Sequence, residues 1–345
     1  MPPTVLVTGD AGYCGSHACL ALDAAGYRLV GLDNLCTGSA ETRARVAAAL
    51  RRPMRCHVGD VRDADALGEL MRAEGVGAVV HFAALKSVPE SRARPGPYFD
   101  NNVAGSRALL SAMRAAGVRR LVFSSSAAVY GAPGRSPVAE TARLAPDSPY
   151  AVSKAQVEAL IAAERAGDPA FRAVSLRYFN PVGADPSGVV GETPHAPPDN
   201  LMPRVVEVAA GLRPVLPVCG GDWPTRDGSC VRDYLHVGDL AQAHVAALQR
   251  LDAPTPLPPA INLGTGRGTT VLELVRAFEQ ATGQRVPFEI VPRRTGDVAE
   301  VWADPGLARE RLDWRAQHGL AQMCADAWRW HLARAGQGGG GPALV

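Results

Sequence analysis

Short apolar runs alternate with longer Ala-rich segments of helical periodicity through the first half of the chain. The short runs are rich in Val, Leu and Phe and are bounded by turn residues, so they predict strands. Strands are expected at residues 5–8, 29–32, 55–58, 78–82, 121–125 and 173–177, with helices such as 106–116 and 151–166 between them. Strands that alternate with helices form a parallel sheet covered on both faces. The sequence therefore predicts an α/β fold with a doubly wound parallel sheet.

The pattern changes after about residue 180. Proline-rich stretches at 194–198 and 254–259 predict loops, and helices are expected at 201–210, 238–251, 271–282 and 320–333. We expect residues 1–180 to form the sheet domain and residues 181–335 to form mainly a smaller lobe that covers it. Residues 336–345 include four consecutive glycines and are expected to be disordered.

Charge and cysteine content narrow the classes of function. The formal net charge is only +2 and no basic run is interleaved with aromatic residues, so nucleic acid is not an expected partner. No run of about 18 apolar residues could span a membrane, and the first strand begins without a secretory signal. The seven scattered cysteines lack a C-x-x-C pair and indicate reduced thiols of a cytoplasmic protein. The eight histidines lack ligand spacing, so no metal is predicted.

A glycine turn joins the first predicted strand to the first predicted helix. Gly9, Gly12 and Gly15 have the spacing G-x-x-G-x-x-G in the strand-to-helix context of a Rossmann-type dinucleotide fingerprint. Such glycines let the backbone approach a pyrophosphate, which the free N–H groups of the helix N-terminus then bind. A turn that needs glycine for its conformation alone is the alternative.

Two carboxylates end the second and third predicted strands. Asp33 lies 18 residues after Gly15, where a carboxylate accepts hydrogen bonds from both ribose hydroxyls of adenosine and repels a 2′-phosphate. This position favours NAD over NADP as the cofactor. Asp60 is placed either to accept a hydrogen bond from the adenine amine or to cap the following helix, and the sequence leaves both open.

Tyr150 and Lys154 lie four residues apart at the start of a predicted helix and therefore share one face. The chain has 34 arginines but only two lysines, so a lysine at this spacing indicates a role that suits a compact ammonium. A phenol has a pKa near 10, and a cation about 4 Å away lowers it by about three units at an effective dielectric constant of about 20. With Ser126 at the end of the fifth strand to orient the same substrate oxygen, Ser126, Tyr150 and Lys154 are the predicted catalytic residues, with Tyr150 as the base.

Several longer strings carry a resemblance that extends from Val5 to about Trp330. They include LDNL at 32–35, HFAALK at 81–86, NNV at 101–103, SSSA at 124–127, SPY at 148–150, RYFNPVGA at 177–184, NLMP at 200–203 and VRDY at 231–234. On these strings the chain resembles the extended short-chain dehydrogenase/reductase superfamily and, within it, the UDP-glucose 4-epimerases. The second lysine, Lys86, falls in one of them.

The resemblance implies an isomerase of galactose and carbohydrate metabolism that acts on UDP-galactose and UDP-glucose with tightly bound NAD. Tyr150 would remove the 4-hydroxyl proton while C4 gives a hydride to NAD. The 4-keto sugar would then rotate and take the hydride back on its other face. NAD would bind to residues 1–180 and the UDP-hexose mainly to the lobe at 181–335. The family usually pairs as homodimers, here through helices at 102–116 and 151–166.

The resemblance also assigns binding residues. The cofactor-binding residues are Gly9, Gly12, Tyr13, Cys14, Gly15, Asp33, Asn34, Asp60, Val61, Phe82, Ala83, Lys86, Asn101, Ser126, Tyr150, Lys154 and Phe179. The substrate-binding residues are Ser126, Tyr150, Asn180, Asn200, Leu201, Cys219, Arg232, Arg294, Asp297 and Val301. The chemistry of the two arginines agrees, because a forked guanidinium suits a diphosphate.

Two positions depart from the family pattern. Cys219 stands where members of the family place an aromatic residue near the uracil, which leaves the base contacts open. Val301 occupies the position of the sugar gate, which is bulky in some hexose-only enzymes and smaller in enzymes that accept N-acetylated sugars. Val301 thus predicts that the pocket also admits UDP-GlcNAc.

Other functions share much of this pattern. A 4-epimerase of UDP-GlcNAc/GalNAc, UDP-glucuronate or a UDP-pentose stays open. Nucleotide-sugar dehydratases and decarboxylases typically carry an acidic residue shortly after the Ser or Thr, whereas Ala127 and Ala128 follow Ser126 here. A non-catalytic NAD sensor can lose the tyrosine or the lysine, but this chain keeps both. These last two classes are therefore disfavoured.

Overall fold

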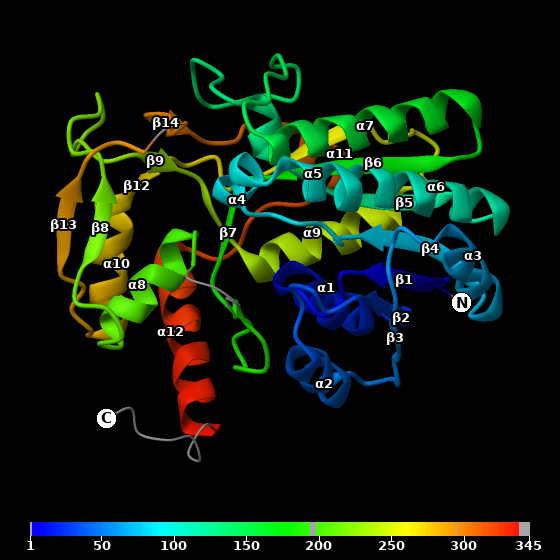
Figure 1. Cartoon of the computed structure of the whole chain (residues 1–345), viewed down its shortest axis with the longest axis horizontal. Helices are drawn as coiled ribbons and strands as arrows, with labels where there is room; N and C mark the ends of the chain where they lie inside the picture. The colour runs from blue at the N-terminus through cyan, green and yellow to red at the C-terminus, as the bar shows by residue number, and fades with distance from the viewer. Residues whose placement is uncertain (1, 194–197, 295, 338–345) are drawn as a thin grey trace.

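The computed structural model describes residues 2–193, 198–294 and 296–337. Its centre is a seven-stranded sheet in the order β11-β6-β5-β4-β1-β2-β3, with every neighbouring pair parallel (Figure 1). The strands are β1 (Thr4–Thr8), β2 (Arg28–Asp33), β3 (Arg55–Val58), β4 (Val76–His81), β5 (Arg120–Ser126), β6 (Arg172–Tyr178) and β11 (Ala260–Leu263). The predicted doubly wound sheet is confirmed.

The strand order reverses beside β1. The chain winds from β1 through β2 to β3 and then returns to β4 on the other side of β1. In open α/β sheets, ligands bind at such a switch point, outside the carboxyl ends of the strands. The fold therefore places the glycine turn after β1 next to the segment that follows β4.

Helices cover both faces of the sheet. Because successive side chains of a strand point to opposite faces, Val5 and Val7 pack into one core while Leu6 packs into the other. The helices on the Val5 side are α1 (Tyr13–Ala24), α2 (Ala40–Ala49), α9 (Val237–Arg250) and α11 (Gly306–Leu312). The helices on the Leu6 side are α3 (Ala64–Ala73), α6 (Gly105–Ala115) and α7 (Pro149–Gly167).

The second half of the chain also builds part of this sheet domain. Helix α9 packs against α1, and β11 extends the sheet beyond β6. The helix was predicted, but the strand was not, because a four-residue run after a proline-rich loop carries little periodicity of its own. Its place depends on pairing with β6. The division into residues 1–180 and 181–335 stays a prediction. Helix α9 and strand β11 belong to the second part of the chain but pack in the sheet domain.

A smaller lobe lies at the left of the main sheet in Figure 1. It has its own apolar core, which includes Val205, Leu216 and Phe278. Its helices are α8 (Leu201–Ala209), α10 (Val271–Thr282) and α12 (Leu320–Gln337). Its short strands are β8 (Leu216–Cys219) with β13 (Phe288–Val291), and β9 (Val231–Arg232) with β12 (Thr269–Thr270) and β14 (Glu300–Val301).

Short elements connect the sheet domain to the lobe. Strand β7 (Asn180–Val182) pairs with β10 (Tyr234–His236) directly after β6. Four further short elements lie between strands and helices of the sheet domain. They are α4 (Val88–Ala93), α5 (Pro95–Tyr98), the π-helix η1 (Phe99–Ala104) and the 3₁₀-helix η2 (Ala127–Tyr130). Helix α12 includes Gly336 and Gln337, whereas the rest of the predicted disordered tail, 338–345, lies outside the described residues. Within the described ranges, no helix combines the length and the apolar character needed to cross a membrane.

A buried ion pair ties the glycine turn to α2. The Asp10 carboxylate is fully buried and accepts from Arg43 Nε at 2.9 Å and Arg43 Nη2 at 2.7 Å. The main chain adds a parallel link, because Ser39 N donates to Ala11 O at 3.1 Å. The turn and the first turn of α2 are thus held as one unit.

We expect Arg43→Met to lower the free energy of unfolding by about 3–5 kcal/mol, because it leaves the Asp10 carboxylate buried without its partner. Urea denaturation of the two proteins measures the difference. Arg119→Met is the control, since it breaks an arginine–aspartate pair with Asp168 that lies in solvent. An Arg43 variant as stable as this control would show that the ion pair contributes nothing.

Candidate active site

The glycine turn and the end of β4 meet closely at the switch point. Gly9 has φ +77°, and a Cβ on it would lie 2.7 Å from Ala83 N. A Cβ on Gly15 would lie 2.1 Å from Gly9 O. Side chains at these positions would push apart the turn, the start of α1 and the segment after β4. The turn leaves a cradle of backbone N–H groups that suits a dinucleotide pyrophosphate.

Asp33 sits at the carboxyl end of β2, beside the turn. Its Oδ2 accepts from Ala11 N at 3.2 Å and its Oδ1 from Leu35 N at 2.7 Å. Two main-chain donors therefore hold the carboxylate in place, next to the cradle. A carboxylate at this place fits the adenosine half of NAD, because it can accept hydrogen bonds from the ribose hydroxyls.

Asp60 does not cap the helix that follows it. Helix α3 is capped by Asp63, whose Oδ1 accepts from Ala66 N at 3.0 Å. Asp60 instead accepts from Asn34 Nδ2 at 3.1 Å and pairs with Arg62 at 2.7 Å. Hydrogen bonds from Arg62 hold the pKa of Asp60 well below its usual range. The carboxylate thus stays charged at the end of β3, with Asn34 beside it.

Tyr150 opens α7 and points to the carboxyl end of β5. The helix begins there because Ser148 Oγ accepts from Ala151 N at 3.3 Å and Pro149 occupies the first helical position. Burial raises the pKa of Tyr150, whereas a hydrogen bond with Ser126 and the charge of Lys86 lower it. The structure therefore brings Ser126 and Tyr150 together, as predicted from the sequence.

Lys154 is buried one turn after Tyr150. Its Nζ donates to Ser124 O at 2.7 Å and lies 6.0 Å from the centroid of the Tyr150 ring. Burial lowers the pKa of this ammonium to about 8. The sequence predicted that Lys154 acts on Tyr150, and this role stays a prediction. The charge of Lys86 also lowers the phenol pKa.

Two polar residues beside these groups were missed by sequence reasoning as site residues. Tyr178 OH hydrogen-bonds Ser124 Oγ and the thiol of Cys14, and burial raises the pKa of Cys14 to about 11. Asn102 Oδ1 accepts from Leu85 N at 2.8 Å, and its Nδ2 donates to Leu85 O and Ser153 Oγ, each at 3.0 Å. Asn102 thus joins the segment before Lys86 to α7. Both lie within strings quoted above, which was the available signal.

The other predicted cofactor residues surround the same edge of the sheet. Gly12 is the N-cap of α1, and Tyr13 OH donates to Gly183 O at 2.7 Å. Phe82 packs on His244 with ring centroids 4.6 Å apart. The remaining contacts are those of Val61 with the core beneath α6, Asn101 with Asn102, and Phe179 with the cluster that contains Val301.

The predicted substrate residues fall into two groups. Asp297 accepts from Arg294 Nη2 at 2.9 Å and lies 3.7 Å from Arg232 Nη2, so one carboxylate holds both guanidinium groups. Val301 pairs in register with Arg232 on the neighbouring strand, and Cys219 ends β8. Asn180 begins β7, and Asn200 and Leu201 begin α8 on the side nearer the sheet domain.

Known proteins with similar sequences show the family to which the chain belongs. Residues 5–264 match the model of the NAD dependent epimerase/dehydratase family. The chain is 50% identical to the UDP-glucose 4-epimerase 2 of Oryza sativa subsp. japonica over 332 residues, which cover 95% of this chain and 81% of that protein.

Solved structures are similar over nearly the whole chain. The UDP-glucose 4-epimerase of Stenotrophomonas maltophila, crystallised with bound NAD and formylated UDP-arabinopyranose, is 49% identical with a TM-score of 0.94, covering 97% of this chain and 100% of that chain. The enzyme of Bifidobacterium longum, in complex with NAD+ and UDP, is 40% identical with a TM-score of 0.92, covering 96% and 99%.

Proposed function

The chain belongs to the NAD dependent epimerase/dehydratase family, and we propose that it is a UDP-glucose 4-epimerase that interconverts UDP-galactose and UDP-glucose. The observation that carries this function is the convergence of Tyr150 and Ser126 with the glycine turn at one edge of the sheet. The resemblance stated from the sequence is confirmed by the relatives. NAD, held by the glycine turn and Asp33, supplies the hydride acceptor and donor when it is bound.

Tyr150 acts as the base and then as the acid of the reaction. Its phenolate accepts the proton of the 4-hydroxyl group, and the phenol returns a proton when the sugar is reduced on its other face. Since burial raises the pKa of Tyr150, the phenolate depends on the nearby positive charges and on the hydrogen bond with Ser126. Ser126 also orients the substrate oxygen toward the phenol.

Arg232 and Arg294 bind the diphosphate of the substrate in this proposal. Both are held by Asp297, which orients their guanidinium groups without blocking every donor. Asn180, Asn200 and Leu201 contact the nucleotide sugar from the other side, and Cys219 lies near the uracil. The 4-position then reaches Tyr150 between the lobe and the sheet domain.

We expect purified protein to convert UDP-galactose to UDP-glucose without added NAD, because the cofactor is regenerated in each cycle. Tyr150→Phe is expected to lower kcat by at least about 100-fold, since it removes the base. Chromatography of the UDP-sugars measures turnover, and the absorbance of released cofactor measures bound NAD. A Tyr150→Phe protein that retains NAD and full activity would contradict this role, whereas no turnover even with NAD supplied would point to a uronate or pentose substrate.

A second substrate class is favoured by the size of Val301. This short side chain packs with Phe179 and Ala303 at the gate position. We infer that its small size admits an N-acetyl group there. We expect the protein to epimerise UDP-GlcNAc as well. Val301→Tyr is expected to lower the ratio of UDP-GlcNAc to UDP-glucose turnover by about tenfold or more, because the ring would occupy that space. An unchanged ratio, or no UDP-GlcNAc turnover by the parent protein, would contradict the idea.

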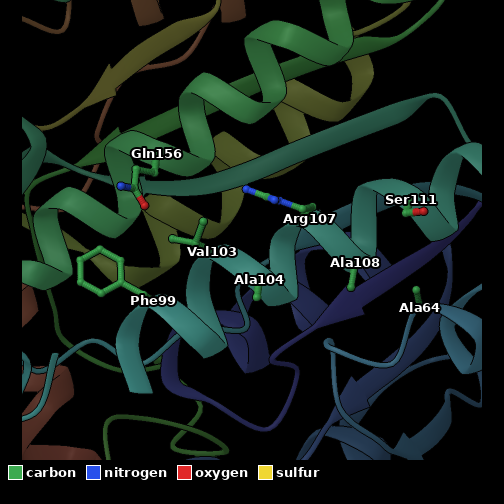
Figure 2. Close-up of a pocket in the computed structure, with 8 residues that line it drawn as sticks. All are labelled: Ala64, Phe99, Val103, Ala104, Arg107, Ala108, Ser111 and Gln156. Carbon is green, nitrogen blue, oxygen red and sulfur yellow. The ribbon is translucent and has the colours of Figure 1, made fainter. Parts of the chain in front are cut away.

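We also propose a homodimer formed through α6 and α7. A groove of about 530 Å³ lies on this face, and none of its lining residues is a predicted active-site residue. Figure 2 shows the groove along η1 and α6, with Gln156 contributed by α7. Its small side chains allow a partner helix to approach closely. The lining residues are Ala64, Phe99, Val103, Ala104, Arg107, Ala108, Ser111 and Gln156.

Sedimentation is expected to give the mass of two chains. Ala104→Arg should shift the protein to the monomer, because a long charged side chain would have to be buried at the contact. Ala73→Arg, on the exposed end of α3 outside the groove, is the matched control. A monomeric parent protein would remove this proposal.

A cytoplasmic location is also proposed, and it is supported by the free state of all seven cysteines.

A further inference from the structure

A carboxylate outside every quoted string lies between the two sides of the site. Glu192 Oε1 accepts from Lys86 Nζ at 3.0 Å and from Asn200 Nδ2 at 2.8 Å. Lys86 belongs to the predicted cofactor residues and Asn200 to the predicted substrate residues. One oxygen atom therefore joins the segment after β4 to the start of α8.

The main chain fixes Glu192 at this place. Its carbonyl oxygen accepts from Trp330 Nε1 at 3.1 Å, and Gly191 forms a bridge with Ala184. A Cβ on Gly191 would lie 2.4 Å from the Trp330 ring, so the chain passes flat against α12 before it reaches Glu192. The side chain of Glu192 is only 12% exposed. Its orientation is set by the lobe, while its partners come from both sides.

We propose that Glu192 is a positioning residue of the epimerase reaction, which holds Lys86 and Asn200 in place across the two sides of the site. The inference rests on the proposed function and deepens it. The charge of Lys86 lowers the pKa of Tyr150 and so favours its phenolate. An ammonium paired with a carboxylate acts more weakly, because the two charges oppose each other at the phenol.

Other titratable groups also face this region. Lys154 approaches from α7, Cys14 from α1 and Tyr178 from β6, while Tyr13 responds to the charge of Glu192. The charge of Glu192 raises the pKa of Cys14 as well, so a substitution at Glu192 lowers the pKa of Tyr13 and Cys14 in the same direction as that of Tyr150. Removal of the carboxylate charge should therefore lower the pKa of Tyr150, since the positive charge of Lys86 then acts alone.

A neighbouring carboxylate provides a matched control. Asp199 lies directly before Asn200 and accepts from Ser87 Oγ, so it joins the same two segments as Glu192. Among the described hydrogen bonds and ion pairs, Asp199 has none with Lys86 or with the Asn200 side chain. Asp199→Asn thus removes one negative charge from the same region without disturbing the contacts of Glu192.

The test compares Glu192→Gln, Lys86→Met and Asp199→Asn as NAD-bound proteins. In Glu192→Gln the amide oxygen still accepts hydrogen bonds, so only the charge is lost. We expect the acid limb of the kcat/KM profile for UDP-galactose to move to lower pH by about 0.5 unit or more. Lys86→Met should move it to higher pH. Asp199→Asn should match the parent protein.

A second readout does not need turnover. The ultraviolet difference absorbance of tyrosinate, measured for Glu192→Gln against Glu192→Gln/Tyr150→Phe, reports the titration of Tyr150 directly. We expect it to shift in the same direction as the acid limb. Glu192→Ala removes the acceptor as well and should raise KM for UDP-galactose by about fivefold, because the Asn200 amide loses its partner.

The outcomes separate the two levels of the proposal. If the parent protein does not convert UDP-galactose, the proposed function fails, while the tyrosinate titration still decides the role of Glu192. A Glu192→Gln protein with the same Tyr150 titration as the parent, or an equal shift in Asp199→Asn, would overturn the inference. Opposite shifts in Glu192→Gln and Lys86→Met would support it.

Discussion

The parallel pairing of the central strands is the constraint on which the site depends. In a parallel sheet all carboxyl ends meet at one edge, and the reversal of strand order between β1 and β4 opens a crevice there. The glycine turn follows β1, Asp33 ends β2, the segment that carries Lys86 follows β4, and Ser126 ends β5. Residues far apart in the chain therefore converge without any long loop.

Three consecutive serines of β5 illustrate how this edge is organised. Ser124 Oγ forms a hydrogen bond with Tyr178 OH, and the Ser124 carbonyl oxygen accepts one from Lys154. Ser125 Oγ donates a hydrogen bond to Glu158 on α7. Ser126 turns toward Tyr150. Because alternate side chains point to opposite faces, Ser125 supports the helix while its neighbours serve the site. The three serines of this strand end thus make separate contacts.

Two buried ion pairs lie behind the site and hold its elements in place. Asp10 pairs with Arg43, and Glu158 accepts from Arg177 Nη2 at 2.6 Å. Arg177 also donates to Tyr130 OH, which in turn donates to Asn262 on β11. This chain of contacts links α7, β6 and β11. A charge left alone in such surroundings would be costly, so each pair restrains two elements at once.

Local patterns in the sequence determined the fold class, six of the seven strands of the central sheet and the glycine turn, because each depends on residues that are close in the chain. The family strings indicated Ser126 and Tyr150. Only the tertiary structure decided that β11 joins the sheet and that Asp63 rather than Asp60 caps α3. Glu192 belongs to the same group, since its partners lie 106 and 8 residues away. Electrostatic effects depend on distances in space, and these are set by packing between elements that no local pattern records.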